Sequence, residues 1–110
     1  MLSWVPRAAV LLCGEDMTEA SLQRSIQKAI EAAGGKVYKI HGGPYSVVGA
    51  PDLMGSLDGK PFAIEVKLPG KLSTLTPKQA YELQCWKAQG WNTGVATTVE
   101  EAKTIVYLSQ

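Results

Sequence analysis

Two carboxylates and a lysine, Asp52, Glu65 and Lys67, have the types and spacing of residues that hold a metal ion beside a phosphate. Glu65 and Lys67 are two positions apart, so in a strand their side chains face the same side. Magnesium is typically bound by one or two carboxylates and keeps several waters for phosphate chemistry. Whether these three residues form such a site depends on the chain that joins Asp52 to Glu65.

The segment Gly49 to Lys67 is predicted to fold as two short strands joined by a tight turn. Asp58-Gly59 is typical of a two-residue hairpin loop, because both central residues of a type I′ turn need positive φ. With that turn Leu57 pairs with Lys60, and the same register places the two carboxylates opposite each other. A slip of one residue would turn the apolar set outward. That set shares one face and consists of Leu53, Leu57, Phe62, Ile64 and Val66.

Carboxylates directly opposed on a hairpin are roughly 4.5–5.5 Å apart at Cβ and repel each other, so a cation is expected between them. We expect Mg²⁺, with Mn²⁺ able to substitute, bound by Asp52, Glu65 and the backbone carbonyl of Val66. Lys67 can then hold a nucleophilic water or offset charge that develops on a phosphate. The alternative is an ordinary surface hairpin with a Glu-Lys pair, which contributes little to stability.

Four ordered motifs resemble a known nuclease family. Gly49-Ala50-Pro51-Asp52 followed by Ile64-Glu65-Val66-Lys67 is similar to the paired motif of the PD-(D/E)XK nuclease superfamily. The stretch from Leu68 to Ser73, and then Thr76-Pro77-Lys78-Gln79, resemble more narrowly the virus-type replication-repair nuclease (VRR-NUC) domain. The resemblance covers Thr18 to Ile105. It implies an α/β fold with a PD-(D/E)XK, restriction-endonuclease-like core, in which helices flank a central mixed β-sheet.

The resemblance also implies roles for single residues. Asp52 and Glu65 would bind Mg²⁺, and Lys67 would assist catalysis. Glu19 would reach the metal through water, and Gln79 would orient Lys67 or a water. Alternatives stay open for two of them: Glu19 lies three residues after Asp16, in the position of a capping box, and Gln79 is also an ordinary polar residue of a first helical turn.

The elements that must position these residues are predicted from periodicity and from turn residues. Apolar residues at helical spacing from Leu22 to Ala33 indicate a helix with one buried face. The full expectation is a helix from Asp16 to Gly34-Gly35, a strand over Lys36–His41, the hairpin, a helix from Pro77 to Gly90 with Thr76 as its cap, a strand over Gly94–Thr98 and a helix over Val99–Leu108. Trp86 and Trp91 are expected in the core, or one of them at a subunit interface.

The composition is that of a single globular domain, with 110 residues, 45% hydrophobic and 19% charged. Residues 17–110 are expected to form this domain, preceded by residues 1–16 as an upstream extension, an added strand or a dimer contact. The apolar run Ala8–Cys13 is too short to span a membrane. Cys13 and Cys85 are too few for a disulfide scaffold. A reducing, intracellular location is expected, namely the cytoplasm, or the host cytoplasm if the source is viral.

DNA is the expected partner, with contacts from Lys71, Lys78 and Tyr45. Neither lysine is expected to have an acidic neighbour at helical spacing. The net charge of only +1 indicates that any contact with nucleic acid is local and is built up by a second subunit. The lone histidine, His41, is expected to be structural.

The resemblance extends to the substrate. Small stand-alone members of the family resemble Holliday junction resolvases, which act as homodimers, so it implies an endonuclease for branched DNA, with roles in DNA repair and recombination and a viral or phage setting. Two alternatives remain: a nuclease that cuts flaps or duplex ends, and a catalytically inactive module that binds nucleic acid or assembles a replication complex.

Overall fold

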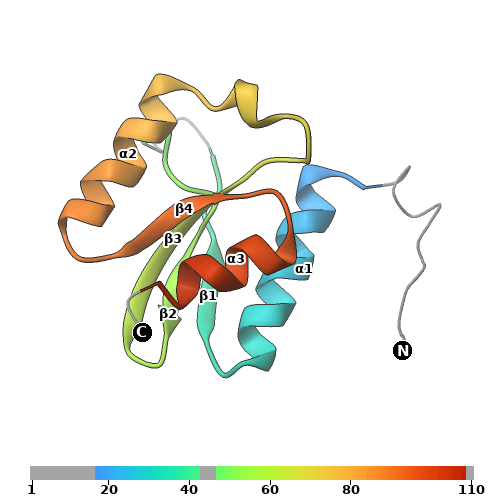
Figure 1. Cartoon of the computed structure of the whole chain (residues 1–110), viewed down its shortest axis with the longest axis vertical. Coiled ribbons are helices and arrows are strands. Elements are labelled where there is room, and N and C mark those ends of the chain that lie inside the picture. The colour runs from blue at the N-terminus through green and yellow to red at the C-terminus, as the bar shows by residue number, and fades with distance from the viewer. Residues whose placement is uncertain (1–16, 43–46, 109–110) are drawn as a thin grey trace.

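The computed structural model describes residues 17–42 and 47–108. Within these ranges the chain forms three α-helices and one four-stranded sheet (Figure 1). In chain order the elements are α1 (Glu19–Ala32), β1 (Lys36–Lys39), β2 (Leu53–Leu57), β3 (Lys60–Val66), a 3-10 helix η2 (Leu72–Thr74), α2 (Pro77–Ala88), β4 (Asn92–Ala96) and α3 (Val99–Val106). The α/β fold class is confirmed.

The sheet is mixed, with strand order β1-β2-β3-β4. The first three strands are antiparallel, and β4 joins β3 in parallel after the crossover through α2. The predicted hairpin register is confirmed, because Leu57 pairs with Lys60 and Leu53 pairs with Ile64. Both turn residues have positive φ, 53° at Asp58 and 78° at Gly59.

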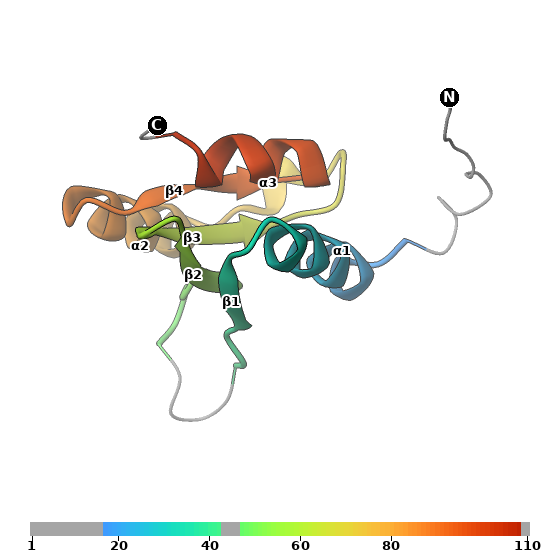
Figure 2. The same cartoon turned by 90° about the horizontal axis from the view of Figure 1, so that it is seen from below.

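The core lies between one face of the sheet and the helices α1 and α3, which contact each other along that face (Figures 1 and 2). Phe62, Ile64 and Val66 of β3 are fully buried there, together with Ile26 of α1. Because side chains alternate along a strand, Glu65 points to the opposite face. There α2 packs on β3 and β4. The alternation of β3 thus separates an apolar core from a polar face.

The start of α1 differs from the prediction. Thr18 is the N-cap: its hydroxyl accepts a hydrogen bond from the Ser21 backbone N–H at 3.0 Å, and the Ser21 hydroxyl accepts one from the Thr18 N–H at 2.9 Å. This reciprocal pair places the cap two residues after Asp16, which itself lies outside the described residues. Glu19 is therefore the first residue of α1 rather than the third, and its capping-box interpretation is wrong.

The last strand begins and ends earlier than predicted, and the last helix begins at Val99 as predicted but ends earlier. β4 starts at Asn92, because Asn92 pairs with Phe62 at the beginning of the parallel ladder. It ends at Ala96, since Thr98 becomes the N-cap of α3 and accepts a hydrogen bond from the Glu101 backbone N–H at 3.0 Å. The helix α3 stops at Val106, two residues before the predicted end.

Two further predictions need correction. β1 ends at Lys39 instead of His41, although the Ile40 N–H still donates to the Asp52 carbonyl at 2.8 Å. Trp86 and Trp91 are only partly buried and contact each other, with ring centroids 4.6 Å apart, so they pack beside the core and not within it. In the described ranges no helix is long and apolar enough to cross a membrane.

Candidate active site

Glu65 is the centre of the polar face. It is 2% exposed, although it is a carboxylic acid. Its Oε2 accepts a hydrogen bond from Gln79 Nε2 at 3.1 Å and lies 3.7 Å from Lys67 Nζ. Its Oε1 is buried and has no hydrogen-bond partner among the described residues. Buried carboxylate oxygens without a partner are costly, so this atom indicates a place where a ligand is needed.

Asp52 immediately precedes β2 and continues its register, which brings it opposite Glu65. Its Oδ2 accepts a hydrogen bond from the Val66 backbone N–H at 2.8 Å, and this contact holds the carboxylate against β3. In an antiparallel pair the N–H and C=O of one residue point toward the same neighbouring strand. The Val66 carbonyl therefore faces the same side as the Asp52 carboxylate, as the predicted ligand set requires.

The electrostatics of the two carboxylates agree with this placement. The pKa of Glu65 is raised to about 8 from an ordinary value of 4.5, first by burial, then by the Asp52 charge and by the hydrogen bond that a protonated Glu65 can donate to Asp52. The Lys67 ammonium lowers this pKa and opposes them in part. A proton on Glu65 relieves the repulsion when no cation is bound. A divalent cation would remove the need for that proton.

Several observations fit a divalent metal at this position: two carboxylates that repel each other, one unpartnered buried oxygen between α2 and the sheet, and a carbonyl on the same side. Among the described residues, no three His, Cys, Asp or Glu side chains cluster closely enough to form a ligand set by themselves. Glu19 is exposed at the start of α1, but its charge contributes to the raised pKa of Glu65. The Glu19 charge thus reaches the pair, but Glu19 does not form a three-residue ligand cluster with it.

Gln79 has two roles at once. It is the third residue of α2, and its Oε1 accepts a hydrogen bond from the Thr76 N–H at 2.9 Å while the Thr76 hydroxyl accepts one from the Gln79 N–H at 3.1 Å. Its Nε2 remains free to reach Glu65. The interpretation of Gln79 as a polar residue of the first helical turn is confirmed, and the side chain that its amide contacts is Glu65, not the predicted Lys67.

The remaining predicted DNA contacts are spread around this face. Lys71 is exposed in the loop after β3, and Lys78 is half-exposed at the start of α2. The prediction that Lys78 has no acidic neighbour at helical spacing is wrong, because its Nζ lies 3.7 Å from Oε2 of Glu82, one helical turn later. Tyr45 lies outside the described residues.

A pocket of about 260 Å³ opens beside the carboxylates. Asp52 and Gln79 line it together with residues that follow β1 and precede β2: Ile40, His41, Gly42, Val47, Val48, Gly49 and Ala50. Sequence reasoning missed Val47 and Val48, although two adjacent β-branched residues directly before a Gly-Ala-Pro-Asp motif are an unusual loop composition. It also missed Gln23, a buried amide of α1 whose Oε1 has no partner in the described chain. The signal was its place one turn after Glu19 on the buried face.

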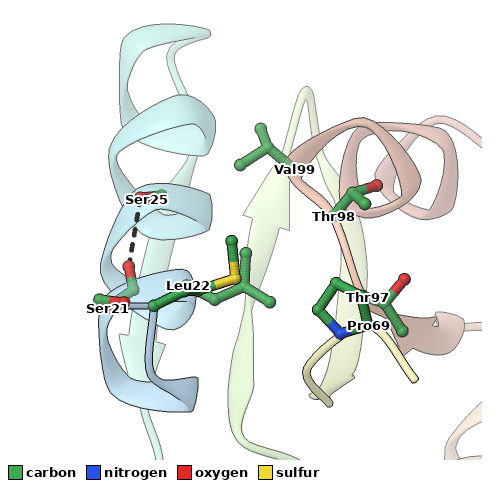
Figure 3. A pocket seen from close by; sticks show the side chains of 8 residues that line it. Ser21, Leu22, Ser25, Pro69, Thr97, Thr98 and Val99 are labelled. Atoms are coloured by element: carbon green, nitrogen blue, oxygen red, sulfur yellow. Dashed lines mark hydrogen bonds between the residues drawn. The ribbon is translucent and has the colours of Figure 1, made fainter. Parts of the chain in front are cut away.

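A larger pocket, about 480 Å³, lies between the first turns of α1, Pro69 and the connection from β4 to α3 (Figure 3). Its lining combines apolar side chains such as Leu22 and Val99 with the hydroxyls of Ser21, Ser25, Thr97 and Thr98. It contains none of the charged residues that could hold a metal. Size alone therefore does not identify the candidate site, because the smaller pocket is the one whose lining includes a carboxylate, Asp52.

Comparison with known proteins agrees with this geometry. A scan against protein-family models found no match, and no curated protein matches the sequence. Among solved structures, one described as a VRR_NUC domain superposes with a TM-score of 0.64 at 28% sequence identity, covering 80% of this chain and 92% of that one. This chain therefore folds as a VRR-NUC-like domain of the PD-(D/E)XK type.

Proposed function

We propose that this protein is a metal-dependent DNA endonuclease that hydrolyses phosphodiester bonds. The observation that carries the proposal is Glu65, a buried carboxyl group with an unpartnered oxygen, opposed to Asp52 and flanked by Lys67 and Gln79. A surface hairpin with an ordinary ion pair would leave Glu65 in water. The likeness to a VRR_NUC domain supports a nuclease role for this arrangement.

Each residue of the site has a distinct proposed role. Asp52, Glu65 and the Val66 carbonyl would hold Mg²⁺, or Mn²⁺ in its place, with Glu19 contributing through water. When bound, the ion polarises the phosphate and lowers the pKa of a water. Lys67, fixed by its ion pair in a nearly buried position, places positive charge where negative charge develops on the phosphate. Gln79 keeps the Glu65 carboxylate in its orientation.

Branched DNA is the proposed substrate, and a homodimer the proposed assembly. A junction is resolved by two cuts on opposite strands, which requires two active sites at a fixed separation, and a closed two-fold dimer is the commonest way to provide them. The net charge of +1 is consistent with a DNA-binding surface shared by two subunits.

The test uses purified protein with linear duplex, flap and four-way junction DNA, in magnesium, manganese or EDTA. Cleavage of the junction with either metal and none in EDTA is expected. Lys67→Met should abolish cleavage, because it removes the charge but retains the buried stem. Lys103→Met, an exposed lysine of α3, is the matched control and should cut normally.

The other outcomes separate the alternatives. Full activity in a folded Lys67→Met protein would contradict the proposed site. Cutting of flaps or ends by a protein that light scattering finds to be monomeric would favour those substrates over junctions. Binding to all three DNAs with no cleavage in either metal would identify a nucleic-acid-binding module.

A further inference from the structure

Two apolar side chains project into water at the mouth of the candidate active site. Val47 is 60% exposed and Val48 is 74% exposed. Both line the pocket that Asp52 and Gln79 also line. Valine is usually buried, and scattered exposed apolar residues need no explanation. An adjacent pair beside the proposed scissile phosphate is different, because any DNA strand that enters the pocket passes it.

This pair is tied to the catalytic elements through the next residue. Gly49 has φ +81° and packs against the first turn of α2 so closely that a Cβ there would lie 2.7 Å from Lys78 Cγ and 3.0 Å from the Lys78 carbonyl. The Ala50 N–H donates to the Val47 carbonyl at 3.2 Å and closes the turn. Lys78 precedes Gln79, which holds Glu65. The position of the two valines is thus set relative to the metal-binding carboxylates.

We propose that Val47 and Val48 form an apolar wedge that contacts base faces exposed beside the cleavage site, and that this contact selects distorted DNA over continuous duplex. The inference rests on the proposed nuclease function and names the part of the site that determines its specificity. In a continuous duplex each base face is covered by its neighbours, so the valines would meet only sugar and phosphate. At a branch or an unpaired segment, base faces are uncovered and can bury apolar side chains.

The charge of Lys78 and the stiffness of the valine side chains favour DNA as the ligand of this surface. The stem of Lys78 lies against the same turn at Gly49, and its exposed ammonium, 3.7 Å from Glu82 Oε2, can pair with a phosphate, while the valines offer apolar surface. A β-branched side chain has few rotamers to lose on contact. Burying one Val raises affinity about tenfold, so losing the pair should weaken binding to distorted DNA by roughly a hundredfold if both are fully buried in the contact.

The experiment compares two DNAs of identical sequence, one fully paired and one with an unpaired segment, in EDTA so that neither is cut. The wild type is expected to prefer the unpaired DNA. Val47→Ser/Val48→Ser should bring the ratio of the two dissociation constants close to one, with duplex affinity and its salt dependence unchanged. Leu108, two residues beyond the end of α3, is a comparably exposed apolar residue (59% exposed). Leu108→Ser should leave the ratio as in wild type.

A spectroscopic measurement reports the contact directly. The fluorescent base analogue 2-aminopurine, placed in the unpaired segment, should change its emission when wild type binds and should not do so with the double variant. A ratio and an emission change that survive in a folded double variant would overturn the wedge, as would a wild type without preference for unpaired DNA. A double variant that keeps the ratio but changes mass in light scattering would assign the valines to a subunit contact instead. Each result is read from binding, so the wedge can fail while metal-dependent cleavage stands.

Discussion

Glu65 shows how one residue joins folding to chemistry. The hairpin turn determines the place of Glu65 on β3, and the packing of α2 buries it. Burial and the neighbouring Asp52 then raise its pKa. Because the pKa rises from 4.5 in an unfolded chain to about 8 in the folded one, the folded state binds the extra proton. Metal-free stability should therefore be complete below about pH 4.5 and decline as the pH rises toward 8.

Glu65→Gln tests this dependence, since the amide is a neutral substitute for the protonated acid. In EDTA the free energy of unfolding of the variant, relative to that of wild type, should increase by a few kcal/mol as the pH is raised from acidic to mildly alkaline. Urea unfolding across that range measures the difference. Comparing the two proteins cancels other titrating groups. A difference between them that does not change with pH would mean that Glu65 is ionised in the folded protein.

At the scale of the element, α2 begins with a capping box whose third residue also serves the site. Thr76→Ala removes one half of this box and should cost about 1 kcal/mol of stability, while the Gln79–Glu65 hydrogen bond persists. Gln79→Ala removes the other half and the contact with Glu65. We expect comparable losses of stability but a fall in kcat only for Gln79→Ala, measured under conditions where both proteins are fully folded. Equal kcat values would limit Gln79 to capping.

The accuracy of the sequence prediction also differs from element to element. The hairpin was predictable to the residue because Asp58-Gly59 fixes the turn and alternation fixes the faces. The cap of α1 was not, since Asp16 and Thr18 are both good cap residues and only the hydroxyl of Ser21 decides between them. The bounds of β4 depend on its pairing with β3. The Gln79–Glu65 contact depends on how α2 crosses the sheet. Neither can be predicted from the local sequence.

For the whole molecule, affinity for DNA has to come from a few lysines, because the net charge is only +1. Lys71→Ala/Lys78→Ala should weaken binding to every DNA and lower the salt slope by about two. The ion pair of Lys78 with Glu82 does not alter this expectation, since an exposed pair contributes little. Lys36→Ala/Lys103→Ala, away from the carboxylates, is the control for charge alone. An unchanged slope in the first double variant would place the DNA on another surface.

The connection between the carboxylates has a kinetic consequence. Asp52 and Glu65 are joined by a hairpin with a two-residue turn, whereas β4 reaches β3 only after the whole of α2. Closing a short loop costs less entropy than closing a long one, and non-local strand pairs form slowly. The two acids are thus expected to approach each other in the folding transition state, before α2 covers them. In stopped-flow chevron analysis, Leu57→Ala should mainly slow folding and Ala96→Gly should mainly accelerate unfolding; the opposite pattern would show that the crossover forms first.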